Sequence, residues 1–271
     1  MLFSDIETSV ADGRPFRLYL FERGATRWAY TNADHDIDFQ ATRWQAIAIA
    51  DDGLRVTGET SANQLTLTLP DDLEVVRMFR GVAPSEEIWL TVRDSHFGLP
   101  DDPASAAVVW VGSARAIRRP EPGKAEIVCN SLSASMGNDG LRLSFERNCP
   151  HSLYDGQCRV ARETYKIPCA ITSMDGAQVT VNTTLANIYT GGVIEWRTGF
   201  YTERRGIEAQ TVSTLALLGG TAGLDIGLEV SLFPGCDQTS ATCNGRFANM
   251  LNYGGFRHMP GKSPFDGEPI Y

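Results

Sequence analysis

The sequence predicts a mainly β protein, with a β-barrel or sandwich-like N-terminal domain followed by a β-rich C-terminal domain. Apolar and polar residues alternate with period two through the first half, and Gly, Pro, Asp and Asn bound the alternating runs. Near residue 145 the sequence changes to a loop rich in Cys, Pro and Gly. The 271 residues suffice for two modest domains. We therefore expect an N-terminal β-rich domain at residues 1–146 and a C-terminal β-rich domain at residues 147–271.

The strands of the first domain follow from the alternation. Leu65, Leu67 and Leu69 illustrate it, since every second side chain of a strand points to the same face. The alternation predicts strands, each with one buried and one wet face, at residues 16–20, 28–31, 65–69, 88–92, 106–116, 124–129 and 141–145.

One segment of this domain has helical spacing, at residues 71–80. Asp71 or Asp72 can cap its first amides, and Gly81 can end it. Three apolar residues share its inner face: Val75, Val76 and Phe79.

The second domain returns to strands after the loop. We expect these at residues 170–173, 178–182, 191–196, 207–212 and 228–233. Asp175 and Gly176 separate the first two, and an Asp-Gly pair readily adopts the positive φ angles of a tight hairpin turn. From Cys236 onward the sequence has little regular periodicity, and an irregular tail of this length usually needs something to hold it.

Charge and composition exclude several classes of function. The chain has 24 Lys plus Arg against 33 Asp plus Glu, and its net charge of −9 opposes a general grip on nucleic acid. An acidic wall is still compatible with DNA passing along it. The N-terminus lacks the pattern of a secretory signal, and no run approaches the roughly 18 apolar residues of a membrane span. We therefore expect a soluble protein made in a cytoplasm, where cysteines stay reduced.

Two pairs of cysteines form the strongest local signal. Eight residues separate Cys149 from Cys158, and six separate Cys236 from Cys243. Each pair is expected in a loop, where the side chains can converge. Four thiolates hold either zinc or an iron–sulfur cluster, and zinc ligands in a pair are usually two to four residues apart. The wider gaps fit a larger cluster somewhat better, but spacing alone leaves open zinc and plain burial in the core.

We expect structural or surface roles for the remaining cysteines, for two of the histidines and for the pairs of adjacent charged residues. Cys129 and Cys169 fall in or beside expected strands and are predicted core residues. His151, two positions from Cys149, could replace a thiolate, although a structural or solvent-exposed role is favoured for it and for His258. We expect surface positions for the acidic pairs 51–52, 71–72, 86–87 and 101–102. The arginine pairs 118–119 and 204–205 are too small for a nucleic-acid footprint.

No motif of a known catalytic centre is present. The sequence lacks the Gly-x-Ser-x-Gly, His-Glu-x-x-His, phosphate-loop and dinucleotide-binding patterns. We therefore expect a protein that is not an enzyme.

The C-terminal motifs resemble those of the conserved phage protein family BR0599. They are RNCPHSLYDGQC at residues 147–158, PGCDQTSATCNGRFAN at 234–249 and NYGGFRHMPG at 252–261. The resemblance covers nearly the whole chain and is strongest from Arg147 onward. The family comprises tail tip proteins of long-tailed phages, prophages and gene transfer agents, and its C-terminal part is similar to the tail tip hub protein of lambda-like phages.

This resemblance implies a structural hub at the tail tip or baseplate of a virion or gene transfer agent particle. Such a hub is assembled in the bacterial cytoplasm, forms a homotrimer and joins the distal tail protein to the central fibre or baseplate protein. DNA passes its channel without specific binding.

The resemblance also implies a cofactor, an iron–sulfur cluster of the [4Fe–4S] type. Its four ligands would be Cys149, Cys158, Cys236 and Cys243. The cluster would staple two distant loops and hold the irregular tail. Four apolar residues of the tail either surround the cluster or pack as in any domain: Phe247, Leu251, Tyr253 and Phe256. The alternatives are the same assembly protein with zinc or no metal, and a redox or cell-wall-hydrolysing enzyme.

Overall fold

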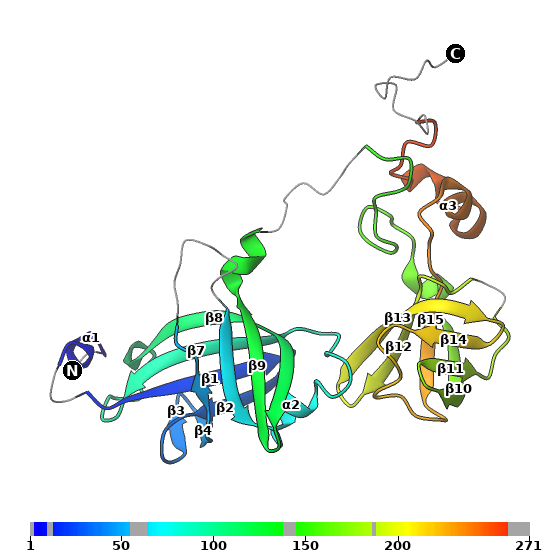
Figure 1. The fold of residues 1–271 in the computed structure, drawn as a ribbon. Helices are drawn as coiled ribbons and strands as arrows, with labels where there is room; N and C mark the ends of the chain where they lie inside the picture. The colour runs from blue at the N-terminus through cyan, green and yellow to red at the C-terminus, as the bar shows by residue number, and fades with distance from the viewer. Residues whose placement is uncertain (1–2, 10–12, 55–63, 138–144, 186–187, 260–271) are drawn as a thin grey trace. The chain divides into compact units, whose positions relative to one another are not determined.

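The computed structural model describes residues 3–9, 13–54, 64–137, 145–185 and 188–259. Over these residues the protein is mainly β, as predicted, and it divides into two compact units, Met1–Asp139 and Gly140–Tyr271 (Figure 1). Each unit has its own hydrophobic core. The strand expected at residues 141–145 falls almost wholly outside the described residues.

The described part of the first unit contains a nine-stranded sheet in the order β3-β4-β2-β1-β7-β8-β9-β6-β5. Its strands are β1 (Pro15–Arg23), β2 (Thr26–Thr31), β3 (Ile37–Phe39), β4 (Thr42–Ala46), β5 (Ala50–Asp51), β6 (Leu65–Pro70), β7 (Ile88–His96), β8 (Ala106–Glu121) and β9 (Lys124–Ser131). Its helices are α1 (Phe3–Glu7), α2 (Glu74–Arg77) and the 3₁₀ helices Pro103–Ser105 and Leu132–Gly137. The strands predicted between residues 16 and 129 are confirmed, whereas the short β3, β4 and β5 were not predicted.

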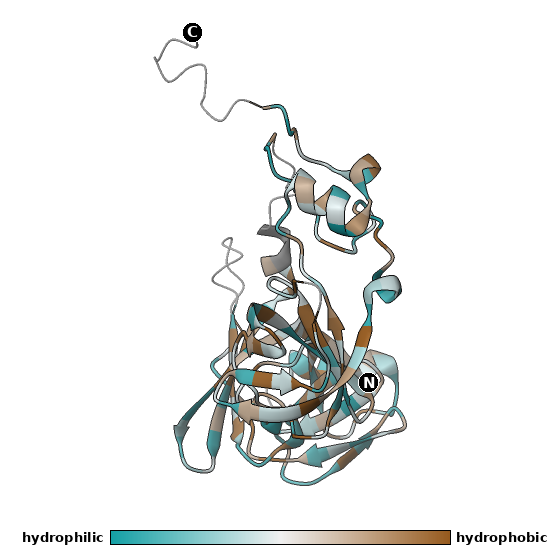
Figure 2. Ribbon diagram, turned by 90° about the vertical axis from the view of Figure 1, so that its right-hand side faces the viewer, coloured by the Kyte–Doolittle hydropathy of each residue, from teal (hydrophilic) through white to brown (hydrophobic). Residues whose placement is uncertain are grey.

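Strand β1 differs from the prediction because both of its faces are buried. Phe16 and Leu18 belong to one apolar cluster, with Trp44 of β4. Tyr19 and Phe21 belong to a second, larger cluster. The expected wet face of β1 is therefore wrong: apolar side chains cover this strand from both sides. In Figure 2 the strands carry hydrophobic and hydrophilic residues in alternation.

The predicted helix is present but shorter, and the predicted cap is wrong. Helix α2 begins after Leu73, which makes no side-chain cap. Asp71 instead accepts a hydrogen bond from the Gly123 amide at 3.3 Å, which ties this turn to the one between β8 and β9. Val75 and Val76 are buried as predicted.

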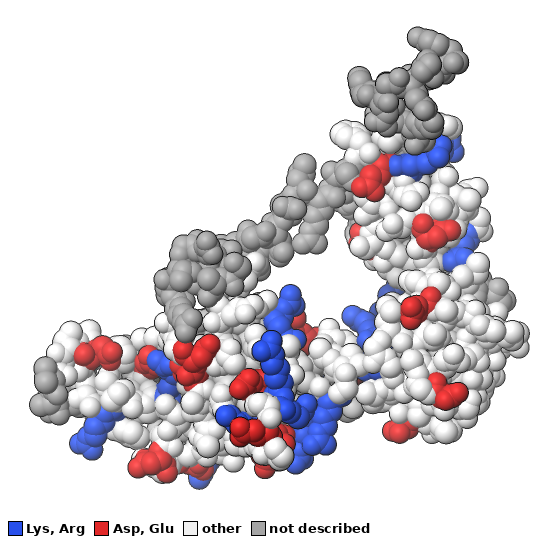
Figure 3. Space-filling view, viewed as in Figure 1, with Lys and Arg blue, Asp and Glu red and all other residues white. Residues whose placement is uncertain are grey.

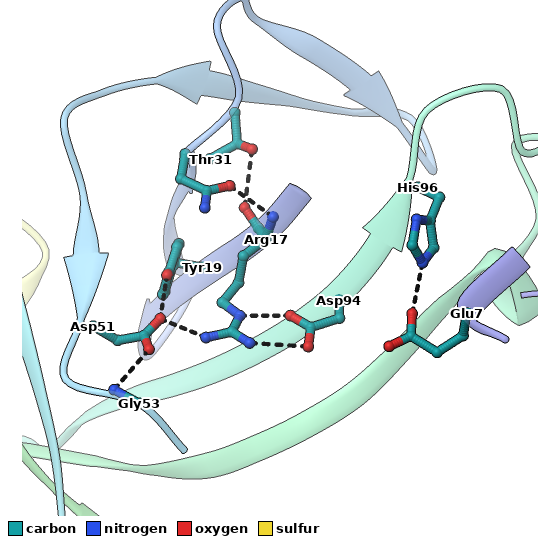
Figure 4. Close-up of polar contacts among 9 residues, drawn as sticks. Glu7, Arg17, Tyr19, Thr31, Asp51, Gly53, Asp94 and His96 are labelled. Atoms are coloured by element: carbon teal, nitrogen blue, oxygen red, sulfur yellow. Dashed lines mark hydrogen bonds and ion pairs between the residues drawn. The ribbon is translucent and has the colours of Figure 1, made fainter. Parts of the chain in front are cut away.

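Arg17 of β1 lies at the centre of a polar network in this unit (Figure 4). Its Nε is 2.5 Å from Asp94 Oδ1, and its Nη1 is 2.6 Å from Asp51 Oδ2. The Tyr19 hydroxyl donates to the same Asp51 oxygen at 2.6 Å. The side chain of Asp51 is only 9% exposed, so the expected surface position of this carboxylate is wrong. Figure 4 also shows α1 tied to β7 through Glu7 and His96, 2.6 Å apart.

Replacing Arg17 with Met is expected to destabilise the first unit by about 2 kcal/mol, because it leaves a mostly buried Asp51 carboxylate without its countercharge. Arg27→Met is the matched control, since the side chain of Arg27 is 69% exposed and its pair with Glu22 contributes little. Denaturant unfolding measures both variants, and equal losses would contradict the assigned role of Arg17.

The network also predicts a pH dependence. Burial raises the pKa of Asp51, but the hydrogen bonds from Tyr19 and Arg17 outweigh it and hold the pKa below its ordinary value. The carboxylate therefore stabilises the fold fully above its unfolded pKa of about 3.9, and this contribution is lost as the pH falls through the folded pKa. As the pH falls from 5 to 3, Arg17→Met should therefore lose less stability than the parent protein.

The second unit contains a closed barrel in the order β10-β11-β14-β13-β12-β15. Its strands are β10 (Ile167–Asp175), β11 (Gln178–Val181), β12 (Val193–Thr198), β13 (Tyr201–Thr211), β14 (Thr214–Leu217) and β15 (Glu229–Phe233). The barrel considered for the N-terminal domain thus lies in the C-terminal one. Gly176 has a φ of 57° in the turn between β10 and β11, as predicted, whereas Asp175 ends β10 and is not among the residues with a positive φ. Cys129 and Cys169 are buried in β9 and β10, which confirms them as core residues.

The segments before and after the barrel are mostly loops, with the 3₁₀ helices Arg162–Tyr165 and Met250–Asn252. The last segment also contains α3 (Ser240–Phe247), which corrects the expectation of a wholly irregular tail. Thr239 caps this helix, its hydroxyl oxygen accepting from the Thr242 amide at 3.2 Å.

The surface carries charges of both signs. On the face drawn in Figure 3, acidic and basic side chains are interspersed. Among the described residues, no helix has the length and apolar character needed to cross a membrane.

Candidate four-cysteine site

The first cysteine pair lies on a loop organised by Asp155. Its carboxylate accepts hydrogen bonds from the amides of Ser152, Gln157 and Cys158, at 3.0, 2.8 and 2.5 Å. Burial raises the pKa of Asp155, but these three backbone donors outweigh it and hold the pKa below its ordinary value. The carboxylate therefore fixes the turn that presents Cys158.

The second pair lies on a turn and a helix organised by Asp237. Its carboxylate accepts from the amide and hydroxyl of Thr239, at 3.0 and 2.8 Å, and from the Thr242 hydroxyl at 2.9 Å. Cys236 precedes this turn, and Cys243 lies on α3 rather than in a loop, which corrects the expectation for that residue. An aspartate beside each cysteine pair thus shapes the local backbone.

The two glycines of the Asn-Tyr-Gly-Gly-Phe motif let the tail approach the first loop closely. A Cβ on Gly254 would lie 2.5 Å from the His151 ring, and one on Gly255 would lie 2.6 Å from the Arg147 carbonyl oxygen. The neighbouring Tyr253 hydroxyl donates to that carbonyl at 2.7 Å, and the Phe256 amide donates to the Glu146 carbonyl at 2.8 Å. The motif is therefore a contact surface for the segment that carries Cys149.

The structure brings all four predicted cysteines to one small cavity. Its volume is about 20 Å³, and its lining includes Cys149, Cys158, Cys236 and Cys243. The two loops are also joined directly, since the Cys149 amide donates to the Gln238 carbonyl at 2.8 Å. Four thiols from two distant parts of the sequence thus share one site.

Hydrogen-bond donors point at three of the four sulfurs. The Gly254 amide donates to the Cys149 sulfur at 3.4 Å, and the Gln238 amide donates to the Cys236 sulfur at 3.3 Å. The side-chain amide of Asn249 lies 3.7 Å from the Cys158 sulfur. N–H donors of this kind stabilise thiolates and tune the groups that they bind.

The site disfavours free thiolates. Burial raises the pKa of the Cys236 thiol, although the Gln238 amide partly opposes this. Burial also raises the pKa of the Cys243 thiol, and the charges of the other three cysteines raise it further. Ionising Cys236 and Cys243 together therefore requires a compensating positive charge, which a bound metal would supply.

The remaining predicted residues take different positions. Phe247 is buried and lines the cavity, whereas Leu251 is fully exposed and Phe256 is 48% exposed. Neither of the two expected roles, packing around a cluster or ordinary packing within the domain, holds for the exposed Leu251. His151 lines the cavity and has a buried Nδ1 without a hydrogen-bond partner, while His258 is exposed beside Arg257.

Four cysteine sulfurs are the kind of ligand that zinc and iron–sulfur clusters prefer. In this structure, however, the side chains are not arranged to coordinate a single metal ion. Among the described His, Cys, Asp and Glu side chains, no group of three or more is placed so that it could hold a metal ion. The cavity has room for about one water molecule. Four thiols and N–H donors to three sulfurs are nevertheless the donor types that surround a thiolate-ligated cluster.

Asp155→Ala is expected to loosen the Cys158 turn and to lower the stability of the second unit by about 1 kcal/mol, because three amides lose their acceptor. Glu163→Ala is the control, since Glu163 is an exposed residue of the same segment. Thermal unfolding measures both. Unchanged stability of Asp155→Ala would refute the role given to this carboxylate.

The fold and the pocket together define a class: a two-unit β protein whose second unit joins a closed barrel to a four-cysteine pocket. Residues 187–263 match the model of a family described as "Phage conserved hypothetical protein BR0599". The family resemblance expected from the motifs is thereby confirmed, over a range that contains the second cysteine pair.

One protein sequence and one solved structure are also similar to this chain. An uncharacterized protein of Xylella fastidiosa (strain 9a5c) is 30% identical over 168 residues, which are 57% of this chain and 34% of that protein. The chain thus spans about a third of the length of this relative. A chain from a structure titled "Virion of native gene transfer agent (GTA) particle" aligns with a TM-score of 0.78 at 18% identity, covering 99% of this chain and 95% of the other. This second likeness is one of fold.

Proposed function

We propose that this chain is a structural protein of a phage or gene transfer agent virion, acting as a hub of its tail tip. The main observation behind this proposal is that four cysteines from two distant segments come together beside the barrel. The match to a phage protein family and the fold shared with a chain of a gene transfer agent particle support the virion role. In this role the chain joins the distal tail protein to the central fibre or baseplate protein.

The proposal includes an iron–sulfur cluster, of the [4Fe–4S] type, held by Cys149, Cys158, Cys236 and Cys243. Such a group supplies a rigid covalent cross-link between the loops. The chain's own residues prepare for it: Asp155 and Asp237 shape the two turns, and backbone amides face two of the sulfurs. The cavity is smaller than a four-iron cluster, so loading requires the cysteine side chains to turn.

Zinc at the same cysteines is the alternative cofactor. One zinc ion needs four sulfurs about 2.3 Å from a single point. The described side chains offer no such group. The wider spacing within each cysteine pair is what favours the cluster over zinc.

A structural role also fits the rest of the surface. Phe200, at the turn between β12 and β13, is fully exposed, as is Leu251 near the cysteines. A closed homotrimer is the assembly we propose, because repeated identical interfaces usually close into a ring. The net charge of −9 is compatible with DNA passing without specific binding. Redox or cell-wall-hydrolysing activity is the less favoured function, and turnover of peptidoglycan by the isolated protein would support it.

Deletion and complementation in a host that makes the particle test the proposal. Without the gene, we expect particles that lack completed tails. Restoring the gene should restore them, and a labelled chain should be located at the tail tip by electron microscopy. Complete tails in the deletion strain, or a label elsewhere in the particle, would overturn the hub role.

A further inference from the structure

We propose that Asn249 is a positioning residue that holds Cys158 and Cys243 together across the pocket before any group is bound. The inference deepens the proposed function and rests on it, since it assumes that the four cysteines act as one ligand set. Asn249 lines the cavity, 91 residues from Cys158 and 6 from Cys243. It contacts both.

The side chain of Asn249 reaches the first cysteine loop. Its Nδ2 donates to the Cys158 carbonyl at 2.6 Å and lies 3.7 Å from the Cys158 sulfur. Its Oδ1 accepts from Asn252 Nδ2 at 2.6 Å. This second bond fixes the orientation of the amide, because a flipped group would set two NH₂ groups against each other. The donor end of the amide is therefore committed to Cys158.

The backbone of Asn249 reaches the second cysteine. Its amide donates to the Cys243 carbonyl at 3.1 Å, and its own carbonyl accepts from the Cys243 sulfur at 3.4 Å. Ala248 makes this return possible, because its φ of 47° and ψ of 37° place it in the left-handed region at the end of α3. One residue thus clamps two ligand positions of different loops.

The other two cysteines are held differently. Cys149 and Cys236 receive backbone amides, from Gly254 and Gln238. Removing the Asn249 side chain therefore leaves their donors in place. A local clamp therefore predicts an effect mainly at Cys158, the cysteine that the side chain contacts, whereas a general loss of structure predicts an effect at every cysteine.

Alkylation of each cysteine distinguishes these two cases. The full chain, reduced and kept in chelator, is treated with iodoacetamide, and the labelling rate of each cysteine is followed by mass spectrometry. Asn249→Ala should raise the rate at Cys158 by about three- to tenfold, the range that one lost hydrogen bond gives. The rate at Cys243 should change less, because the backbone of residue 249 still holds that cysteine. Asn249→Gln, which keeps the amide, should lie between the parent and Asn249→Ala. Asn244→Ala, an exposed change on helix α3 just before Asn249, is the control and should leave all rates unchanged.

Two buried cysteines report on the fold in the same experiment. Cys129 and Cys169 lie in the cores of the two units and should stay unreactive. If Asn249→Ala makes Cys169 reactive, the milder Asn252→Ala replaces it, and this variant should raise the rate at Cys158 with Cys169 still protected. Equal increases at all four pocket cysteines, or none, would overturn the clamp.

The result is separable from the cofactor proposal. If the parent protein, purified without air, contains neither iron nor zinc but the increases are selective, the clamp holds and the cofactor proposal fails. If the parent contains a cluster and Asn249→Ala labels like the parent, the clamp fails alone.

Discussion

Replacing Cys236 with Ser is expected to empty the pocket and block tail completion. Serine keeps the size of the side chain but removes one of four soft ligands, and loss of a metal ligand is among the few changes that cost about 4 kcal/mol or more. The second unit should therefore unfold at a markedly lower temperature, while the first unit should keep its transition. Calorimetry of the purified chain and a count of complete particles from the complemented host measure the two effects.

Cys129→Ser is the matched control for this prediction. Cys129 is fully buried in β9, where burial raises the pKa of its thiol far above the ordinary value. A serine there costs stability in the first unit only and leaves the pocket intact. Normal infectious particles from Cys236→Ser would contradict the structural-staple account, as would equal loss of iron in both variants.

Gly235→Ala is expected to have the second-largest effect, because no side chain fits at this position. A Cβ would lie 2.1 Å from the Thr190 carbonyl oxygen, 2.5 Å from the Gly191 carbonyl carbon and 2.6 Å from the Gly192 nitrogen. All three are backbone atoms, so no side-chain rotation relieves the overlap. We expect a loss of about 3 kcal/mol in the second unit, the upper part of the usual range for overpacking. To relieve the overlap the backbone at residue 235 must move, and this movement also shifts the next residue, Cys236.

The same glycine-to-alanine change at Gly245 is expected to increase the stability of the second unit instead of lowering it. Gly245 lies inside α3, and a Cβ there meets nothing within 4 Å. Alanine should stabilise the second unit by up to about 1 kcal/mol, because it favours the helix. Urea unfolding of the two variants measures the contrast. Similar stabilities would show that the close approach at Gly235 does not constrain the fold.

Much of the β architecture follows from the sequence pattern. Alternation predicted β6 and β7 because their buried side chains repeat every second residue, as in Leu65, Leu67 and Leu69. It misrepresented β1, whose second face is covered by residues distant in sequence. Asp51 was placed on the surface for a similar reason, since its partners Arg17 and Tyr19 lie more than thirty residues away.

The sequence predicted which cysteines lie at the site, but not how the site is built. The motif resemblance named the four cysteines that share the cavity, although spacing alone left other readings open. Helix α3 was missed because it is short and rich in polar residues, and its signal was the cap at Thr239. The contacts of Asn249 depend on a left-handed Ala248, a conformation that its sequence does not favour.

The most direct test of the cofactor claim is the content of iron, acid-labile sulfide and zinc, with the visible absorption spectrum, of the chain purified without air. The account predicts a brown protein with iron and sulfide each near four per chain, as for a cubane-type cluster on four thiolates. Zinc near one per chain would replace the cluster with a single-ion staple. A colourless protein without iron, sulfide or zinc would contradict the claim that the four cysteines hold a metal group.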